Sequence, residues 1–219
     1  AQETGKNVVA LTGPSHAEEV CINLPTGLLA ASTDQALAEF VQDAFMADTL
    51  RVYTSPDVQG IEIGAALKNV IALAAGMSDG LGYGDNAKAA LITRGIKEIS
   101  ALAVAMGGRQ ETLSGLAGTG DLIVTCASVH SRNRRAGYLM GQGKTMQEAM
   151  DEVQMVVEGV YSAKAARKLA EKYEVSMPIV EQINEVLFEN KSAAQAVDEL
   201  MLRESKSEHS VLPWPDETV

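Results

Sequence analysis

A single lysine interrupts the most apolar stretch of the chain, GIEIGAALKNVIALAAGMSDG, which covers residues 60–80. On a helix, Lys68 has no acidic residue three or four positions away in either direction. The sequence therefore predicts no ion pair along this helix, and removing the charge should leave the fold equally or more stable. The nearest helical neighbours are small, and Asn69 adds a second polar group. Lys68 either lies over apolar surface with its ammonium group in water or serves as a desolvated proton donor and acceptor.

A glycine-rich stretch, GLAGTGDLIVTC at residues 115–126, could present further polar groups. Its GTG segment does not fit a dinucleotide-binding loop, because no strand is predicted before it and Ile123 occupies the place of the third glycine. We interpret it as a tight loop that presents Asp121 and, one turn later, Thr125. Asp121 as a simple helix cap is the alternative.

Three arginines crowd into HSRNRRAG, residues 130–137, although the chain has a net charge of −11. Ser131 can cap a helix whose first turn carries Arg132 and Asn133. Cations at a helix N-terminus oppose the helix dipole, so this placement costs stability unless an anion binds there. The pattern indicates a phosphate site, with a solvated basic patch as the alternative. The histidines have no paired ligands, so we predict no metal site.

The stretch LTGPSHAEEV, residues 11–20, reads as a strand that runs into a helix. Gly13 and the following proline end the strand, Ser15 can cap the helix, and Glu18 completes a capping-box pattern. A strand end beside a helix N-terminus is the usual ligand-binding edge of an α/β sheet, although the capping box alone would explain these residues.

The elements that must position these groups change in type near Pro56. Before it, strands and helices alternate, with strands at 7–12, 26–32 and 50–55 and helices at 15–20 and 34–47. After it, helix formers dominate, and no β-branched run recurs until LIVT at 122–125. We expect helices at 57–76, 86–106, 111–116, 132–140, 145–152, 162–173, 178–188 and 192–202.

The composition excludes several classes of protein. With 219 residues, 46% of them hydrophobic, the chain can bury a core. An excess of acidic over basic residues, 29 against 18, argues against nucleic acid as a partner. Two cysteines are too few for a disulfide scaffold, and no run reaches the roughly 18 uninterrupted apolar residues of a membrane span. We expect a cytoplasmic protein with reduced thiols that is not an integral membrane protein.

These motifs together resemble one enzyme family. From Gly13 to about Gly159, their order and spacing are similar to those of bacterial NAD(P)-dependent glycerol-3-phosphate dehydrogenases. The stretches that carry the resemblance are GPSHAEE, GIEIGAALKNVIALAAGMSDGLGYGDNAKAALITRG, GLAGTGDLIVTC, SRNRRAG and VVEGVYSA.

The resemblance implies a mainly α fold. Residues 1–55 would be the C-terminal remnant of a dinucleotide-binding Rossmann domain, and residues 56–205 an all-helical substrate domain like the C-terminal domain of 6-phosphogluconate dehydrogenase. Residues 206–219 would form a flexible tail. The family begins with a glycine-rich fingerprint after a strand, and this chain carries no such fingerprint. We therefore expect these 219 residues alone to be inactive.

The implied activity is the interconversion of dihydroxyacetone phosphate and sn-glycerol 3-phosphate with NAD or NADP, which supplies glycerol phosphate for phospholipid synthesis. Lys68 would give a proton to the substrate carbonyl oxygen, Asp121 and Thr125 would orient the substrate, and the turn at 131–133 would hold the phosphate. The residues implied to contact the substrate are Gly13, Ser15, Lys68, Asn69, Asp121, Thr125, Ser131, Arg132 and Asn133. Those implied to contact the cofactor are Ala17, Arg132, Val156 and Glu158.

Two alternatives compete with this interpretation. A related 3-hydroxyacid dehydrogenase, also built from a Rossmann and a helical domain, would use a lysine on a long helix, but its carboxylate substrate needs fewer cations than a phosphate does. The chain could also be a helical assembly module that is inactive alone.

The small-residue helices would suit a homodimer. His16, where the family commonly has phenylalanine, would be a minor change beside the cofactor.

Overall fold

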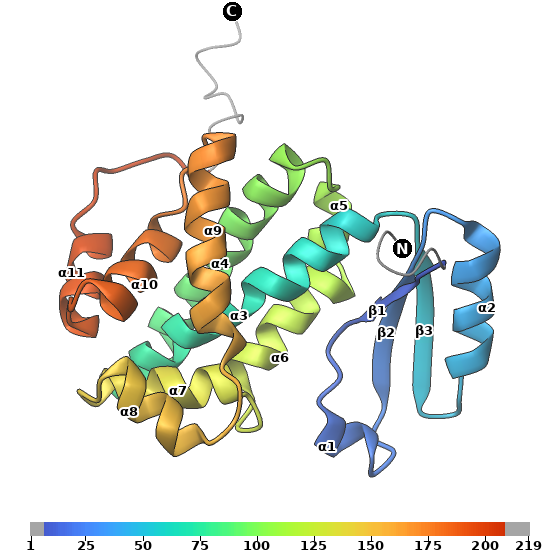
Figure 1. Ribbon diagram of the computed structural model, residues 1–219, viewed down its shortest axis with the longest axis horizontal. Coiled ribbons are helices and arrows are strands. Elements are labelled where there is room, and N and C mark those ends of the chain that lie inside the picture. Colours follow the sequence, from blue (N-terminus) through green and yellow to red (C-terminus); the bar gives the residue numbers. More distant parts are fainter. Residues whose placement is uncertain (1–6, 209–219) are drawn as a thin grey trace, which may run out of the picture.

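A small sheet opens the chain, and every later element is helical, as Figure 1 shows for this computed structural model, which describes residues 7–208. The sheet has the order β1-β2-β3, with β1 antiparallel to β2 and β2 parallel to β3. Its strands are β1 (Ala10–Thr12), β2 (Thr26–Ala31) and β3 (Leu50–Ser55), and its helices are α1 (Ala17–Val20) and α2 (Gln35–Phe45). The sheet packs α2 against a small core that includes Leu28 and Val52, which pair across β2 and β3.

The helical part begins directly after β3 and contains the main core. Its elements are α3 (Val58–Gly80), α4 (Asp85–Ala105), α5 (Gln110–Leu113), the π-helix η1 (Leu116–Gly120), α6 (Asp121–Ala127), α7 (Arg132–Gly141), α8 (Met146–Val153), α9 (Glu158–Tyr173), α10 (Pro178–Phe188) and α11 (Ala193–Met201). The predicted mainly helical class with a short preceding sheet is thus confirmed. The predicted tail, 206–219, lies almost entirely outside the described residues.

The β-branched run at 122–125 lies within α6, where its apolar residues serve the helical core; Leu122, for example, is fully buried. One local prediction was wrong. The capping box expected at Ser15 does not form, since the Ser15 hydroxyl donates to the Gly13 carbonyl instead. His16 is the N-cap residue of α1, and its side chain makes no cap hydrogen bond.

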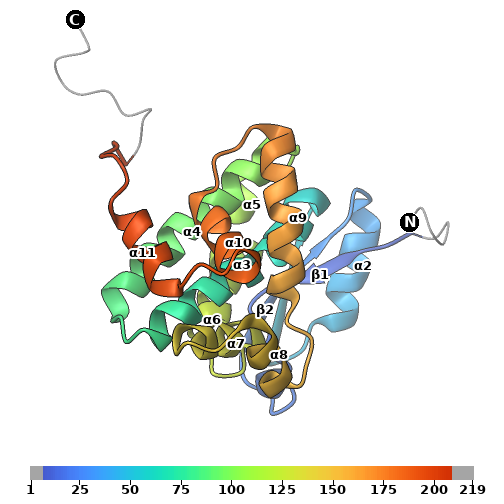
Figure 2. The ribbon, with the colours of Figure 1, turned by 60° about the vertical axis from the view of Figure 1, so that its left-hand side comes forward.

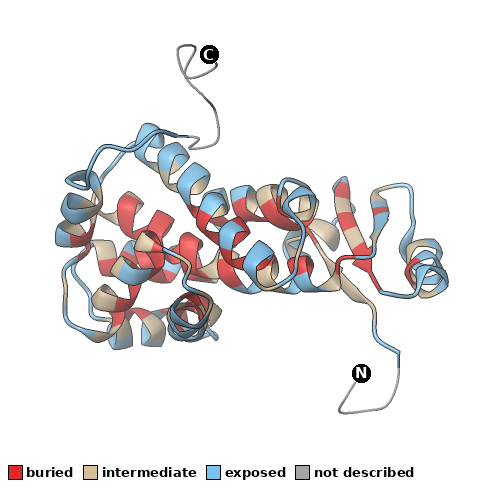
Figure 3. Ribbon diagram, turned by 90° about the horizontal axis from the view of Figure 1, so that it is seen from above, coloured by how far each residue is buried: buried red, intermediate tan, exposed pale blue. Residues whose placement is uncertain are grey.

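Helix α3 is the centre of the helical part. It packs against α4, α6, α7 and α9, which surround it in Figure 2. Buried residues concentrate where these helices meet (Figure 3). The helix has the length and apolar composition of a membrane span, but 67% of that apolar window is buried inside the fold, as befits a core helix.

Helices α3 and α7 approach closely enough for their backbones to touch. A Cβ atom added at Gly76 would overlap the Arg134 carbonyl oxygen, and one added at Gly137 would overlap the Leu73 carbonyl oxygen. One turn further on, Gly80 and the last residue of α7 are equally crowded. Glycine is therefore required along this crossing, which explains the small residues of the apolar stretch.

A buried carboxylate joins the start of α3 to the segment that follows α4. Asp57 caps α3 by accepting from the Gly60 N–H at 2.8 Å, and it also accepts from the Arg109 N–H and the Thr112 hydroxyl. Burial opposes ionisation of this group, but the hydrogen bonds from Thr112, Gly60 and Arg109 lower the pKa of Asp57. The network holds α5, and with it the turn into η1, against α3.

A second buried carboxylate fixes helix α10. Glu98 of α4 accepts from the N–H groups of Ile179 and Val180 at the first turn of α10. Burial raises the pKa of Glu98 to about 7, although these two N–H groups lower it. The charge of Glu181 adds to the rise, while that of Arg203 opposes it.

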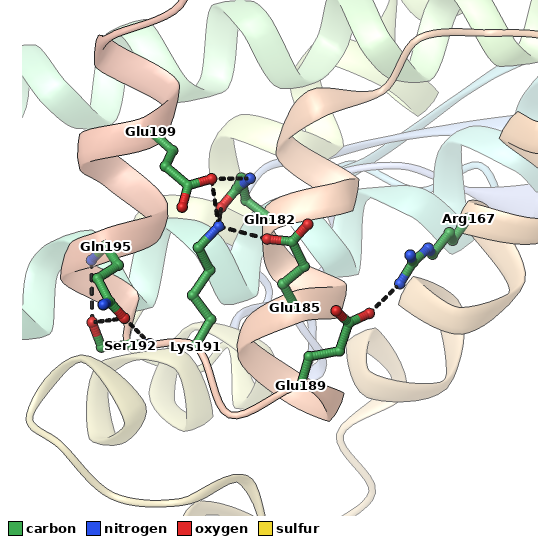
Figure 4. Close-up of polar contacts among 8 residues, drawn as sticks. All are labelled: Arg167, Gln182, Glu185, Glu189, Lys191, Ser192, Gln195 and Glu199. Carbon is green, nitrogen blue, oxygen red and sulfur yellow. Dashed lines mark hydrogen bonds and ion pairs between the residues drawn. The ribbon is translucent and has the colours of Figure 1, made fainter.

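A polar network on the surface closes the connection from α10 to α11, as Figure 4 shows. The Lys191 ammonium lies 2.5 Å from carboxylate oxygens of both Glu185 and Glu199 and donates to the Gln182 side chain. Its partners are 30% and 56% exposed, so the network is open to water. Each of its contacts joins residues of neighbouring elements in the sequence.

Candidate active site

A polar cavity of about 310 Å³ lies between the sheet and the helical part. Ten of the twelve residues singled out above line it, and they come from the β1–α1 loop, α3, α6, α7 and the start of α9. These ten are Gly13, Ser15, Lys68, Asn69, Asp121, Thr125, Ser131, Arg132, Asn133 and Glu158. Segments that are more than a hundred residues apart therefore meet in one cavity.

Lys68 pairs with a carboxylate of α6, a partner that the pattern along its own helix could not show. Its ammonium group donates to Asp121 Oδ2 at 2.5 Å, across 53 residues of sequence. The two side chains are 21% and 3% exposed, respectively. Burial raises the pKa of Asp121, while Lys68 and the Thr125 hydroxyl oppose that rise. Because a buried carboxylate would lose its counter-ion, removing Lys68 should destabilise the fold, which reverses the expectation from sequence.

The segment before Asp121 explains how this carboxylate reaches the cavity. The glycine-rich stretch forms the π-helical turn η1, which leads straight into α6. Gly118 lies so close to the Leu113 carbonyl that no side chain would fit there. Asp121 begins α6, and the Thr125 hydroxyl donates to its carbonyl oxygen at 2.6 Å. Short π-helical turns are frequent at functional sites.

Amide side chains connect α3, α7 and α9 at the cavity wall. Asn133 donates to Asn69 Oδ1 at 3.0 Å and accepts from the Gly159 N–H at 2.8 Å. This hydrogen bond draws residues 158–161 into helix α9, which begins four residues earlier than predicted. Asn133 thereby fixes the start of α9 beside α3.

The arginine cluster divides into groups with different partners. Arg132 lies 2.7 Å from Glu158, and both side chains are 39% exposed at the cavity. Arg134 turns away from the cavity and pairs at 2.6 Å with Asp79 of α3. Arg135 is exposed on α7. Arg132, which was expected to bind an anion, thus already has the carboxylate of Glu158 beside it. Ser131 caps α7 as predicted.

The sheet side of the cavity is the β1–α1 loop. Gly13 has a φ of +142°, which favours glycine, and a Cβ there would lie 2.8 Å from the Gly27 carbonyl oxygen. Two residues proposed to meet a cofactor do not line the cavity: Ala17 at the start of α1 and Val156 just before α9, both of them exposed.

Two histidines also line the cavity: His16, which was expected beside the cofactor, and His130, which reasoning from the sequence did not place in the site. Their rings lie 6.0 Å apart. The spacing of 114 residues between them gave no local signal of this proximity. Among residues 7–208, no group of three or more His, Cys, Asp or Glu side chains is arranged to hold a metal ion.

Comparison with known proteins places this geometry in a family. The profile described as NAD-dependent glycerol-3-phosphate dehydrogenase C-terminus matches residues 57–198. The glycerol-3-phosphate dehydrogenase [NAD(P)+] of Agathobacter rectalis is 67% identical over 208 residues, which are 95% of this chain and 62% of that protein. The protein of the same name from Bacillus subtilis is 58% identical over 198 residues, or 90% of this chain and 57% of that protein.

Solved structures agree with the sequence comparisons. The crystal structure of glycerol-3-phosphate dehydrogenase from Coxiella burnetii has 41% sequence identity and a TM-score of 0.89, and the match covers 92% of this chain and 62% of that one. The chain spans about three fifths of the length of the relatives it matches. By its sequence and its fold, this chain belongs to the NAD-dependent glycerol-3-phosphate dehydrogenase family.

Proposed function

We propose that the chain supplies the substrate site of an oxidoreductase that interconverts dihydroxyacetone phosphate and sn-glycerol 3-phosphate with NAD or NADP. The observation that carries the proposal is the partly buried Lys68–Asp121 pair in the same cavity as Arg132 and Asn133. A proton donor and a set of phosphate ligands lie together there. A three-carbon phosphate ester needs both within a few ångströms of each other.

The proton transfer belongs to Lys68. Addition of hydride to the ketone carbon leaves negative charge on the carbonyl oxygen, and the Lys68 ammonium group donates the proton that completes the alcohol. Asp121 holds the ammonium group in place at 2.5 Å, and Thr125 supports the backbone of Asp121. In the reverse direction, the Lys68 amine takes the hydroxyl proton as hydride leaves the carbon.

The phosphate belongs to the opposite end of the cavity, at the start of α7. Arg132 offers guanidinium N–H groups, Asn133 an amide, and Ser131 a hydroxyl. The half-exposed ion pair with Glu158 holds the Arg132 side chain beside the cavity. Gly13 and Ser15 close the site from the sheet side, and Asn69 lies next to the proton donor.

A nicotinamide cofactor would supply the hydride or take it up. The residues present fit such a group: Ala17 and Val156 leave apolar surface exposed, and Arg132 and Glu158 offer polar contacts beside it. We assign these side chains to the cofactor. A cytoplasmic homodimer completes the proposal, and the molar mass measured by light scattering would test the dimer.

The test is a calorimetric titration of the chain with sn-glycerol 3-phosphate, with 3-hydroxybutyrate as the rival ligand. We expect the phosphate ester to bind and the hydroxyacid to bind at least tenfold more weakly, because charge-assisted contacts to phosphate are worth about 1.5–3 kcal/mol. Equal affinities would favour a 3-hydroxyacid dehydrogenase. No binding of the phosphate ester would overturn the proposal.

A further inference from the structure

His16 carries a buried nitrogen that has no role in the proposed reaction as described above. Its Nε2 atom is buried and has no hydrogen-bond partner, and among the described residues it is the only buried side-chain nitrogen or oxygen in that position. The residue follows Gly13-Pro14-Ser15 and lines the cavity. A buried polar atom without a partner costs stability, so its persistence in a binding cavity points to a partner that arrives with the ligand.

The surroundings of His16 place it between the turn at 131–133 and Asp121. Its ring lies 6.0 Å from that of His130, whose backbone leads directly into the turn at 131–133. On its other side, His16 lies near enough to Asp121 to help lower the pKa of that carboxyl, in the same direction as Lys68. The side chain therefore lies between the two ends of the cavity.

The cationic and amide donors that line the cavity already have partners within the chain. Lys68 donates to Asp121, Arg132 to Glu158 and Asn133 to Asn69. His16 differs from them because its buried Nε2 atom has no hydrogen-bond partner in the described part of the chain. An imidazole can donate an N–H, and its protonated form adds a positive charge.

We propose that His16 Nε2 donates a hydrogen bond to a phosphate oxygen of the bound substrate, which makes it a substrate-binding residue. This assignment rests on the proposed function of the site. It replaces the expectation that a change at this position is minor and concerns the cofactor. A phenylalanine here would fill the space but leave that phosphate oxygen without this donor.

Two variants of the chain test the assignment through affinity. His16→Phe keeps the ring and removes both nitrogens, whereas His16→Gln keeps an N–H donor at a similar reach. We expect His16→Phe to weaken the binding of sn-glycerol 3-phosphate and of inorganic phosphate by the same factor, about tenfold or more. His16→Gln should recover most of the lost affinity. Melting temperatures of all three proteins separate a loss of contact from a loss of folding.

A spectroscopic readout tests the contact directly. The sequence contains three histidines, so the imidazole ¹⁵N spectrum is simple, and the signals that vanish in His16→Phe identify this ring. On titration with sn-glycerol 3-phosphate, the His16 Nε2 signal should shift and saturate at the dissociation constant found by calorimetry.

The possible outcomes separate this inference from the proposed function. If sn-glycerol 3-phosphate binds while the His16 signal stays unmoved and His16→Phe binds as tightly as wild type, the assignment is wrong and the proposed function stands. If His16→Phe binds sn-glycerol 3-phosphate more weakly than wild type but binds inorganic phosphate equally well, the proposed contact to the phosphate group is also wrong. If wild type binds neither ligand, both proposals fall.

Discussion

Two lysines in this protein each lie 2.5 Å from carboxylate oxygens, yet their settings differ. Lys68 pairs with a carboxylate that is 3% exposed and 53 residues away in the sequence. Both line a cavity in which the buried Nε2 atom of His16 has no hydrogen-bond partner. Lys191 joins carboxylates that are 30% and 56% exposed, in neighbouring elements on the surface (Figure 4). The pair of Lys68 joins distant segments and lies beside space for a ligand, whereas the contacts of Lys191 hold the loop between α10 and α11 to these two helices.

The same contrast holds for the two buried carboxylates of these regions. Asp121 faces a cation and a cavity, whereas Glu98 receives only backbone N–H groups among its hydrogen-bond partners and caps α10. Burial by itself therefore does not mark an active site. The marks are a charged partner and space for a ligand beside the pair.

The largest expected effect is at Lys68. In an active preparation, either of this chain or of a longer polypeptide that contains it, Lys68→Arg should lower turnover by roughly 10²–10⁴, because guanidinium keeps the charge but does not release a proton. Its melting temperature should stay close to that of wild type, since the ion pair with Asp121 is retained.

Lys68→Met sharpens the comparison, because it should lose both turnover and stability. The unpaired Asp121 carboxylate should lower the free energy of unfolding by roughly 3 kcal/mol. Steady-state turnover and urea unfolding on the same preparations provide the measurements. If the arginine variant retains turnover within a few-fold of wild type, Lys68 is not the proton donor.

The next effect concerns Glu98 and pH. Its pKa of about 7 in the folded protein lies above the ordinary value of 4.5, so its contribution to stability is full below about pH 4.5 and is lost as the pH rises through 7. Between pH 4.5 and 8, wild type should lose about 3 kcal/mol of unfolding free energy relative to Glu98→Gln.

Urea unfolding of both proteins across this pH range measures the difference. Glu181→Gln, which removes an exposed acid from the first turn of α10, is the matched control: it keeps Glu98, so its free energy of unfolding should fall with pH almost as much as that of wild type, and slightly less because the charge of Glu181 helps to raise the pKa of Glu98. Parallel pH profiles for wild type and Glu98→Gln would show that Glu98 stays ionised in the folded protein.

A smaller effect is expected at Arg132. Arg132→Ala should raise the Michaelis constant for dihydroxyacetone phosphate about tenfold to hundredfold, the usual cost of one charge-assisted contact. Stability should change little, because the pair with Glu158 is 39% exposed on both sides. Arg135→Ala removes an exposed arginine of the same helix and serves as the control. Equal Michaelis constants for the two variants would show that the arginines form a solvated basic patch and not a phosphate site.

The smallest effect should be at Lys191. Lys191→Met removes a cation from a network that water screens, so the melting temperature should fall only slightly and the affinity for sn-glycerol 3-phosphate should not change. Differential scanning calorimetry and titration calorimetry measure the two quantities. A loss of affinity as large as that of Arg132→Ala would break the distinction between the two regions.

Local pattern predicted most of the helices, because apolar spacing and capping residues act within a few positions. The end of α10 at Phe188 and the cap of α7 at Ser131 are examples. The grouping of the site residues came from the resemblance to a family. Local pattern could not supply the Lys68–Asp121 pair, since helix periodicity only shows partners three or four residues away.

The errors have the same origin. The Ser15 capping box followed the local rule, but a backbone carbonyl two residues back took the hydroxyl. The first turn of α9 was missed because an amide from Asn133, on another helix, holds it. The pairing of Arg132 with Glu158 likewise depends on α7 and α9 meeting in space.

The glycine crossing of α3 and α7 has a consequence for catalysis. Lys68 and Asn69 belong to one of these helices, and Arg132 and Asn133 to the other. The two are held by backbone contacts at Gly76 and Gly137, where no side chain can change its rotamer. If the proposed function is right, the proton donor and the phosphate ligands are thus preorganised before substrate arrives, and little reorganisation energy is spent in aligning them with the transition state.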